Sequence, residues 1–198
     1  MMGMWDERYS EPGYAYGTEP NEFLAQHRPE IPPGPVLCLA EGEGRNAVFL
    51  AHRRHEVTAV DQSAVGLEKA QQLAKDRGVT IRTVQADLQN YDLGTAKWAG
   101  IVSIFAHVAP DLRRRVHRDV VRALRPGGIF ILEAYRPEQL QLGTGGPPVA
   151  ELMMTAAELE RELDGLEVLL LEEKQRDVTE GRFHRGLAAV VQLIARKP

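Results

Sequence analysis

The chain has 198 residues and a formal charge of −4, which fits one domain with a substantial core and gives no electrostatic case for nucleic acid or an anionic membrane as its partner. No apolar stretch reaches the ~20 residues of a membrane span, and the N-terminus lacks the apolar core of a signal peptide. A single cysteine, Cys38, excludes an internal disulfide and a cysteine-built metal site, so we expect a cytoplasmic protein without a metal.

The first twenty residues are rich in aromatic side chains, whereas disordered termini usually contain few. We therefore expect this stretch to fold back on the domain, either as a lid over a ligand or as packing against a hydrophobic flank. A helix is predicted from Asn21 or Glu22 to the stop at Pro29. Residues 1–34 are thus expected to form a lid and helix segment ahead of a core at residues 35–198. The aromatic residues assigned to the lid are Trp5, Tyr9 and Tyr16.

The next stretch predicts a strand, a glycine turn and a helix in immediate succession. Val36 to Leu39 reads as a short strand buried on both faces, and a helix opens at Ala47. Between them, Gly42 and Gly44 remove side chains and tolerate the positive φ of a sharp turn. This geometry lets a ligand lie against bare backbone and a helix N-terminus.

Asp61 stands at the carboxyl end of a second predicted strand, Glu56 to Val60. An acid at this position is well placed to accept hydrogen bonds from the two hydroxyls of a ribose. The alternative is that Asp61, with Gln62 and Ser63, only caps the helix that starts near Ala64. The glycine turn upstream favours nucleoside binding.

Strands and helices alternate through the middle of the chain, which indicates a parallel sheet with right-handed crossovers. One basic run lies on a predicted helix, where we expect a solvated face: Arg113 to Arg115. The predicted elements are a helix over 65–77, strands over 79–84 and 101–105, a helix over 111–124, a turn at 125–128 and a strand over 129–133.

The last third predicts a helix over 155–163 that opens with a capping box, and then two apolar strands. These strands, 166–172 and 188–194, are joined through the polar stretch 177–181 without a helical crossover, so they should be antiparallel. The sequence therefore predicts one α/β domain over residues 1–198. Its fold is a Rossmann-like, doubly wound, seven-stranded sheet, mostly parallel with a C-terminal antiparallel pair and with helices on both faces.

Taken together, these motifs resemble the class I S-adenosylmethionine-dependent methyltransferases over about residues 35–195. The leader around Trp5 to Tyr9 and Tyr16 to Asn21 is similar to that of small-molecule methyltransferases of the tellurite-resistance and thiopurine groups. The motifs that carry the resemblance are VLCLAEGEG at 36–44, VTAVD at 57–61, QADL at 85–88 and LRPGGIFIL at 124–132.

The resemblance implies S-adenosylmethionine as cofactor, S-adenosylhomocysteine as product, and a cofactor site at matching positions. In it, the glycines pass under the methionine part, Asp61 holds the ribose, and Asp87 bonds the adenine amino group. The sequence departs from the family at Cys38 and Ala40, where an acid and a glycine are usual, and Glu41 or Glu43 either accepts the cofactor's ammonium or faces water. The implied cofactor-binding residues are Ala40, Glu41, Gly42, Glu43, Gly44, Asn46, Asp61, Gln62, Ser63, Ala86, Asp87, Leu88, Ile104 and Phe105.

The implied reaction is methyl transfer to a small-molecule acceptor by in-line displacement, which depends mainly on proximity and orientation. A base is needed only when the acceptor arrives protonated. His107 follows the fourth predicted strand at the edge where ligands bind, and it is either that base or a surface residue. His184 and Tyr16 are weaker candidates.

Two other functions compete with this one. Residues 42–47 also satisfy G-x-G-x-x-A, so the chain could be an NAD(P)-dependent oxidoreductase, although QADL and the closing antiparallel pair fit a methyltransferase better. The departures at Cys38 and Ala40 leave room for a non-catalytic module that binds S-adenosylmethionine. No stretch marks itself as a subunit interface.

Overall fold

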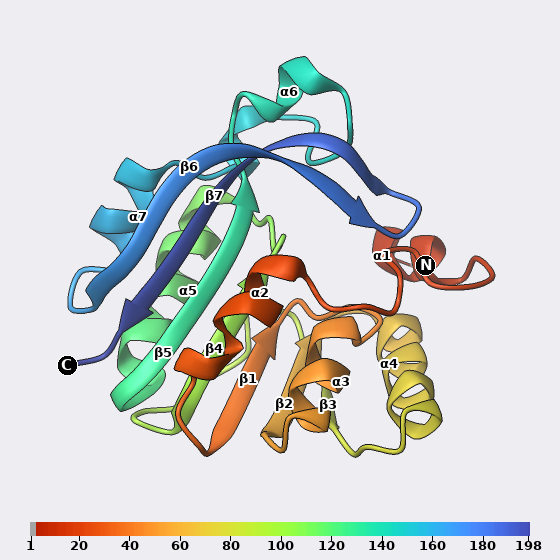
Figure 1. Cartoon of the computed structure of the whole chain (residues 1–198), viewed down its shortest axis with the longest axis horizontal. Coiled ribbons are helices and arrows are strands. Elements are labelled where there is room, and N and C mark those ends of the chain that lie inside the picture. Colours follow the sequence, from red (N-terminus) through yellow and green to blue (C-terminus); the bar gives the residue numbers. More distant parts are fainter. Residues whose placement is uncertain (1–2) are drawn as a thin grey trace.

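The computed structural model describes residues 3–198 and contains a seven-stranded sheet with the strand order β3-β2-β1-β4-β5-β7-β6 (Figure 1). Neighbouring strands from β3 to β5 pair in parallel, whereas β7 pairs with β5 and β6 in antiparallel fashion. This arrangement confirms the predicted fold class. The strands are β1 (Pro35–Leu39), β2 (Glu56–Asp61), β3 (Arg82–Gln85), β4 (Trp98–Ile104), β5 (Leu124–Tyr135), β6 (Glu167–Glu180) and β7 (His184–Arg196).

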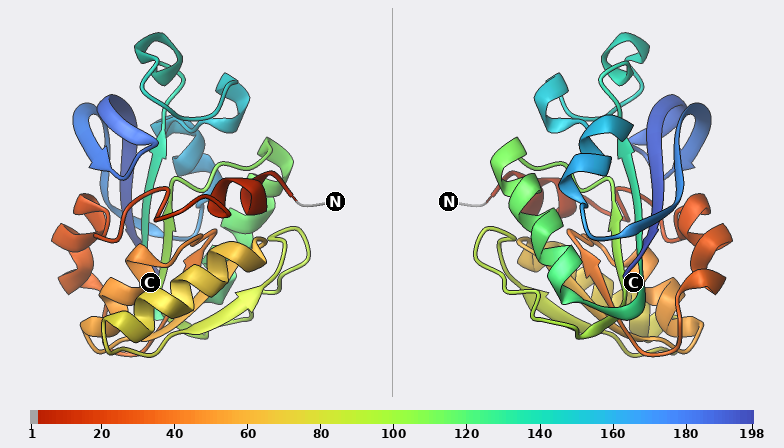
Figure 2. Two further views of the ribbon diagram at one scale, coloured as in Figure 1. Left: turned by 90° about the vertical axis from the view of Figure 1, so that its right-hand side faces the viewer. Right: turned by 90° about the vertical axis from the view of Figure 1, so that its left-hand side faces the viewer.

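Helices cover both faces of the sheet (Figure 2). α2, α3 and α4 pack on one face of the sheet through one buried cluster of apolar side chains. α5 and α7 pack on the other face through a second cluster. None of the helices within residues 3–198 is long and apolar enough to cross a bilayer. The helices are α1 (Met4–Tyr9), α2 (Glu22–His27), α3 (Arg45–His52), α4 (Ala64–Asp76), α5 (Pro110–Ala123), α6 (Gln139–Leu142) and α7 (Ala156–Glu162), with short 3-10 turns η1 (Arg28–Glu30) and η2 (Ala150–Leu152).

β1 shows why an unbroken apolar run forms a central strand here. Successive side chains of a strand point to opposite faces, so Val36 and Cys38 enter the cluster under α2, α3 and α4, while Leu37 and Leu39 enter the cluster under α5 and α7. All four side chains are at most 2% exposed. The strand is thus buried on both faces, as its sequence predicts.

The chain order places a topological switch point at the centre of the sheet. β1 and β4 are neighbours, and the helices that follow them, α3 and α5, lie on opposite faces. Open α/β sheets bind their ligands at the carboxyl ends of such strands. The loops after β1 and β4 begin at Ala40 and Phe105, and both residues line a cavity.

The C-terminal hairpin is longer than predicted. β6 and β7 have 14 and 13 residues, and the polar stretch 177–180, predicted as part of the connection, is paired within β6. β6 is an edge strand of the sheet. It can therefore carry polar side chains while its backbone forms hydrogen bonds with β7. The extra length brings the hairpin tip close to α1 (Figure 1).

Boundaries of other strands also differ from the prediction, and β4 begins at Trp98 instead of Ile101. The third strand begins at Arg82 instead of Val79. The predicted turn at 125–128 belongs to β5, which carries a register shift opposite Trp98 and Gly100.

Arg113 corrects the prediction of a solvated basic face. Its side chain is 2% exposed, and its guanidinium donates to the Glu162 carboxylate at 2.9 Å and to the Met153 carbonyl oxygen at 2.7 Å. Arg114, the next residue, is 48% exposed and pairs with Asp111. Consecutive residues of a helix face different directions, so a basic run on a helix need not share one environment.

Candidate functional site

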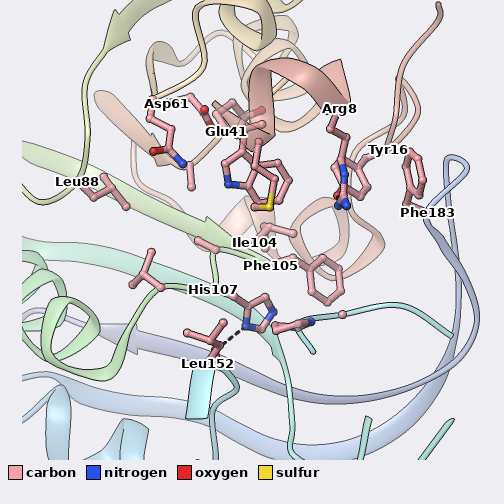
Figure 3. A pocket seen from close by; sticks show the side chains of 18 of the residues that line it. Arg8, Tyr16, Glu41, Asp61, Leu88, Ile104, Phe105, His107, Leu152 and Phe183 are labelled. Carbon is pink, nitrogen blue, oxygen red and sulfur yellow. Dashed lines mark hydrogen bonds between the residues drawn. The ribbon is translucent and has the colours of Figure 1, made fainter. Parts of the chain in front are cut away.

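A cavity of about 590 Å³ lies at the carboxyl ends of β1, β2 and β4, within the usual size range of a small-molecule pocket. The leader, defined as residues 3–21, lines it together with residues 145–148 and the hairpin tip. Figure 3 shows Glu41 and Asp61 on one side and Arg8 and Tyr16 on another, with Phe105 below Arg8 and Tyr16. We name the first side the carboxylate end and the second, which extends to His184, the hairpin end.

Asp61 ties the glycine turn to the end of β2. One carboxylate oxygen accepts a hydrogen bond from the N–H of Gly42 and the other from the N–H of Ser63, both at 2.8 Å. The side chain lines the cavity, and burial raises its pKa although these N–H groups favour the carboxylate. Each oxygen keeps a second lone pair for a ligand hydroxyl.

Glu41 caps the helix that follows the glycine turn. Its Oε1 atom accepts hydrogen bonds from the N–H groups of Asn46 and Ala47 at 2.9 and 2.7 Å, in the first turn of α3. Burial raises the pKa of Glu41 to about 7, against the effects of Ala47, Arg45 and Asn46. Glu41 lines the cavity. Near pH 7, a cation bound there would therefore meet a carboxyl group that is about half ionised.

Two residues of the cavity wall adopt backbone conformations that are uncommon for residues with side chains. Ala40 has a φ of 48° and Phe105 a φ of 53°. Such strain costs roughly 1–3 kcal/mol and is concentrated at functional sites. Ala40 stands where the resemblance expects a glycine, and its positive φ explains that expectation.

Within the described residues 3–198, the residues that line the cavity do not include Gly42, Gly44 and Ser63. The sequence had predicted that these three belong to the cofactor site. A Cβ atom on Gly42 would lie 2.5 Å from the hydroxyl oxygen of Tyr9, and one on Gly44 would lie 2.5 Å from Cβ of Ala70. These glycines therefore allow close packing of the leader and of α4. They shape the turn from outside the cavity.

Several of the predicted cofactor residues also anchor the leader. Glu43 accepts from the N–H of Ala15 at 2.7 Å and from Lys69 at 3.0 Å. The Ser63 hydroxyl donates to Asp6 at 2.5 Å, and the amide oxygen of Asn46 accepts from the N–H of Asn21 at 2.9 Å. With both carboxylate oxygens engaged, Glu43 is a poorer acceptor for a ligand than Glu41.

The remaining predicted residues also line the cavity. Ala86 is fixed by the bond from its N–H to the carbonyl oxygen of Asp61 at 2.9 Å, and Asp87 accepts from the N–H of Gln89 at 2.8 Å. The cavity wall contains all of the following: Gln62, Ala86, Asp87, Leu88, Ile104 and Phe105.

The leader aromatics both cover the cavity and pack. Trp5, Tyr9 and Tyr16 line the cavity, yet Tyr9 is only 5% exposed and stacks on Trp5 with ring centroids 5.7 Å apart. Arg8 donates a hydrogen bond to the Tyr16 hydroxyl at 2.9 Å. The leader therefore lines the cavity and packs on the domain, and its role as a lid stays a prediction.

His107 lies on the cavity, but its contacts disfavour the predicted role as a base. Its Nδ1 donates to the carbonyl oxygen of Leu152 at 2.9 Å (Figure 3), and its Nε2 accepts from the N–H of Tyr135 at 3.3 Å. Burial lowers its pKa to about 4. With both nitrogens occupied, His107 holds the loop after β4 against β5 and η2 and has no free lone pair.

At the hairpin end, the sequence indicated Tyr16, Phe105 and, as a weaker candidate base, His184, but not Tyr135 or Phe183. The rings of Tyr135 and Phe105 lie 4.6 Å apart between centroids, and the ring of His184 lies 4.7 Å from that of Phe105. Tyr135 stands at the carboxyl end of β5, a position that could have identified it. Phe183 carries no such signal, because only the length of the hairpin brings it to the cavity.

A buried ionic network supports the hairpin end from behind. Glu133, which is fully buried, accepts two hydrogen bonds from Arg176, both at 2.7 Å, and one from Asn21 at 2.5 Å. Glu180 accepts from Arg45 and Arg176 at 2.5 and 3.1 Å. The network thereby joins the leader, α3, β5 and β6.

The charges of this network balance, which is what burial requires. Burial alone would raise the pKa of Glu180, but His184, Arg45 and Arg176 outweigh it and lower the pKa to about 2. For Arg176, burial acts against the charge, and Glu133 and Glu180 raise its pKa beyond the usual range. Glu180 and Arg176 therefore remain ionised at neutral pH.

Comparisons with known proteins agree with this geometry. Residues 36–128 match a family model described as a methyltransferase domain. The chain is 27% identical to 2-heptyl-1-hydroxyquinolin-4(1H)-one methyltransferase of Mycobacteroides abscessus, over 72% of this chain and 64% of the relative. It is 25% identical to the uncharacterized methyltransferase YodH of Bacillus subtilis, over 66% of this chain and 54% of the relative.

These matches span only part of the relatives, 64% and 54% of their lengths. Among solved structures, TehB from Haemophilus influenzae superimposes with a TM-score of 0.74 and 17% sequence identity, over 98% of this chain and 66% of that one. At this identity the likeness concerns the fold. Together with the match of residues 36–128 to a methyltransferase domain, it agrees with the resemblance read from the sequence: the chain is similar to class I S-adenosylmethionine-dependent methyltransferases.

Proposed function

We propose that this protein binds S-adenosylmethionine at the carboxylate end of the cavity and transfers its methyl group to a small molecule at the hairpin end. The observation that carries the proposal is the cavity at the switch point, with carboxylates at one end and aromatic rings at the other. Its volume of about 590 Å³ leaves room for a nucleoside cofactor and a small acceptor together.

The residues at the carboxylate end fit the parts of this cofactor. Asp61 lies at the end of β2 with spare lone pairs for the two ribose hydroxyls. Ala86 and Leu88 offer an apolar wall for the adenine. Glu41 supplies a buried carboxylate for the ammonium group, which answers the departure from the family pattern at Cys38.

The cofactor supplies an electrophilic methyl group on a sulfonium. The chain's contribution is to hold the two reactants in line and to exclude water, which lowers the barrier through proximity and orientation. Ile104, the last residue of β4, and Phe105, the next residue, both line the cavity, where they would position the reacting atoms. The aromatic faces at the hairpin end favour a positively charged methyl donor nearby.

The leader supports a small acceptor over a macromolecular one. Trp5, Tyr9 and Tyr16 lie across the cavity, and bonds from Ala15 and Asn21 to residues around the glycine turn hold the leader in place. A nucleic acid or a folded protein would have to displace this cover. The formal charge of −4 points the same way.

The test is turnover with defined acceptors. The protein is incubated with S-adenosylmethionine and a panel of small hydroxylated, amino and thiol compounds, including 2-heptyl-1-hydroxyquinolin-4(1H)-one. The expected result is S-adenosylhomocysteine and a methylated product by mass spectrometry. Binding of S-adenosylmethionine with no release of S-adenosylhomocysteine above the spontaneous rate would favour the non-catalytic module instead.

A further inference from the structure

The hairpin end of the cavity holds a histidine among three aromatic rings. The ring centroid of His184 lies 4.4 Å from that of Tyr16, 4.7 Å from that of Phe105 and 5.5 Å from that of Tyr135. His184 is 8% exposed, and that small exposed part lines the cavity. A molecule that enters this end therefore meets an imidazole between aromatic walls.

Pairing in the hairpin fixes the orientation of His184. Glu180 and His184 are the last cross-strand pair of β6 and β7, so their side chains share one face of the sheet. Nδ1 of His184 lies 3.9 Å from Oε2 of Glu180, and it is buried without a hydrogen-bond partner in the described part of the chain. Because Nδ1 faces Glu180, Nε2 is the nitrogen that the cavity can reach.

His107 and His184 thus differ in the state of their nitrogens. Both nitrogens of His107 are engaged by backbone groups. His184 turns one nitrogen to a carboxylate and leaves the other toward the cavity. A carboxylate 3.9 Å from the inner nitrogen stabilises, through its charge, the imidazolium that forms when the outer nitrogen takes a proton.

We propose that His184 is the general base of this enzyme, that Glu180 is its positioning residue, and that the acceptor carries a hydroxyl group on a planar aromatic ring. The inference rests on the methyl transfer proposed above. The flat walls formed by Tyr16, Phe105 and Tyr135 suit a planar ring. Aromatic hydroxyls have pKa values near 10, within reach of an imidazole base, unlike aliphatic hydroxyls.

In this step one proton moves to His184 and one methyl group moves to the acceptor oxygen. The acceptor oxygen gives its proton to Nε2 of His184 and uses an electron pair to bond the methyl carbon. The carbon–sulfur bond breaks, and its electron pair stays on sulfur, which becomes a neutral thioether. The proton on the imidazolium then leaves to solvent, so no further reactant is needed.

Groups on every element around His184 set its protonation. Burial lowers its pKa, Glu180 and Glu133 oppose the shift, and Arg45 adds to it. His107 and Tyr135 face it as neutral groups at pH 7, and the ring of Tyr16 packs against it. His184 is therefore neutral and ready to accept a proton at pH 7, and turnover should fall as the pH is lowered through its pKa.

The experiment uses 4-nitrophenol as a probe, because its ionised form has its own absorbance band. The full chain is saturated with S-adenosylhomocysteine, and the probe is titrated over pH 5–9 while its absorbance is followed. We expect the bound probe to ionise at least one pH unit lower than the free probe in the wild-type protein. In His184→Gln the shift should disappear, whereas His52→Gln, an exposed histidine at the end of α3, should keep it.

Turnover with a hydroxyl acceptor from the panel gives a second measure. His184→Gln should lower kcat by about 100-fold or more, leave the Kd of S-adenosylhomocysteine within threefold, and abolish the low-pH limb of the rate profile. If His184→Gln fails to fold, the comparison of bound with free probe in the wild-type protein decides by itself. An unshifted or unbound probe, or an unchanged kcat, would overturn the proposal. If the wild-type protein does not bind S-adenosylhomocysteine, this result would instead refute the proposed function.

Discussion

The two ends of the cavity are built in different ways. At the carboxylate end, Asp61 and Glu41 are held by backbone N–H groups within six residues of themselves in sequence, apart from the bond of Asp61 to Gly42. At the hairpin end, Tyr16, Phe105, Tyr135 and His184 come from four distant segments. The first end follows from secondary structure, and the second depends on how the leader and hairpin pack.

Because of this difference, different substitutions should disturb the two ends of the cavity. Backbone hydrogen bonds at strand ends and helix N-termini persist as long as the sheet exists. The hairpin end depends on one buried network that joins Asn21, Arg45, Glu133, Arg176 and Glu180. Damage to the network should therefore disturb the acceptor side before the cofactor side.

The largest effect is expected from Glu133→Ala, which leaves Arg176 buried without its main partner. Removing one member of a buried ion pair costs about 3–5 kcal/mol. Urea unfolding measures the loss in unfolding free energy. The matched control is Glu167→Ala, since Glu167 pairs with Arg196 at the surface, where both are about half exposed, and an exposed pair contributes about 0–1 kcal/mol. Equal losses in the two variants would contradict the role given to the network.

The contact between the glycine turn and the leader is tested by Gly42→Ala. Gly42 has a φ of 62°, and an added Cβ would lie 2.5 Å from the Tyr9 hydroxyl oxygen. Gly78→Ala has a similar φ of 68° but no atom within 4 Å of the added Cβ, so it isolates the backbone strain. Gly42→Ala should lose about 1–3 kcal/mol more than Gly78→Ala because of the clash. Indistinguishable melting curves would mean that the leader is free to move away.

Asp61→Ala should weaken the binding of S-adenosylhomocysteine by about 1–3 kcal/mol through the lost charge-assisted hydrogen bonds. Calorimetric titration measures the change, with circular dichroism as a check on folding because Asp61 also bonds Gly42 and Ser63. Asp92→Ala, at an 81% exposed side chain, is the control. Unchanged affinity would remove Asp61 from the site.

The smallest effect is a pH dependence from Glu41, whose pKa is raised to about 7. Below pH 7 the free protein holds a proton on Glu41, which must be released before the carboxylate meets an ammonium group. Affinity for S-adenosylhomocysteine should therefore rise by up to tenfold per pH unit as the pH increases toward 7 and then level off. Glu41→Gln should bind more weakly and lose this slope. A wild-type slope of zero between pH 5.5 and 7 would place the ammonium group elsewhere.

The same pKa shift has the opposite effect on stability. The folded-state pKa of Glu41 lies above the ordinary value of 4.5, so the unfolded chain releases this proton first as the pH rises. Stability should consequently decrease between about pH 4.5 and 7 in the wild-type protein. Glu41→Gln should show a smaller decrease when urea unfolding is measured across that range.

The sequence predicted the parts of the fold that depend on local patterns. β1, β2 and α4 were expected from apolar runs and helical spacing, and the capping box at Thr155 is present. The far half of the hairpin was missed because residues 177–180 are mostly polar, and only pairing with β7 makes them a strand. Arg113 was missed for a related reason, since Glu162 comes from a helix 49 residues away in sequence.

The same rule separates the residues of the candidate site. Asp61 and Glu41 lie on the cavity where short motifs placed them. Gly42, Gly44 and Ser63 stand beside it, because the leader and α4 occupy the space next to the turn. His184 reaches the cavity only because of the pairing register of the long β6–β7 hairpin. No short sequence motif predicts that register.

The most direct test of the account is calorimetric titration of the wild-type protein with S-adenosylhomocysteine, with NAD and NADP in parallel. The account predicts micromolar binding of S-adenosylhomocysteine alone, in one-to-one ratio, weakened by Asp61→Ala. Binding of a nicotinamide cofactor with no response to S-adenosylhomocysteine would contradict it.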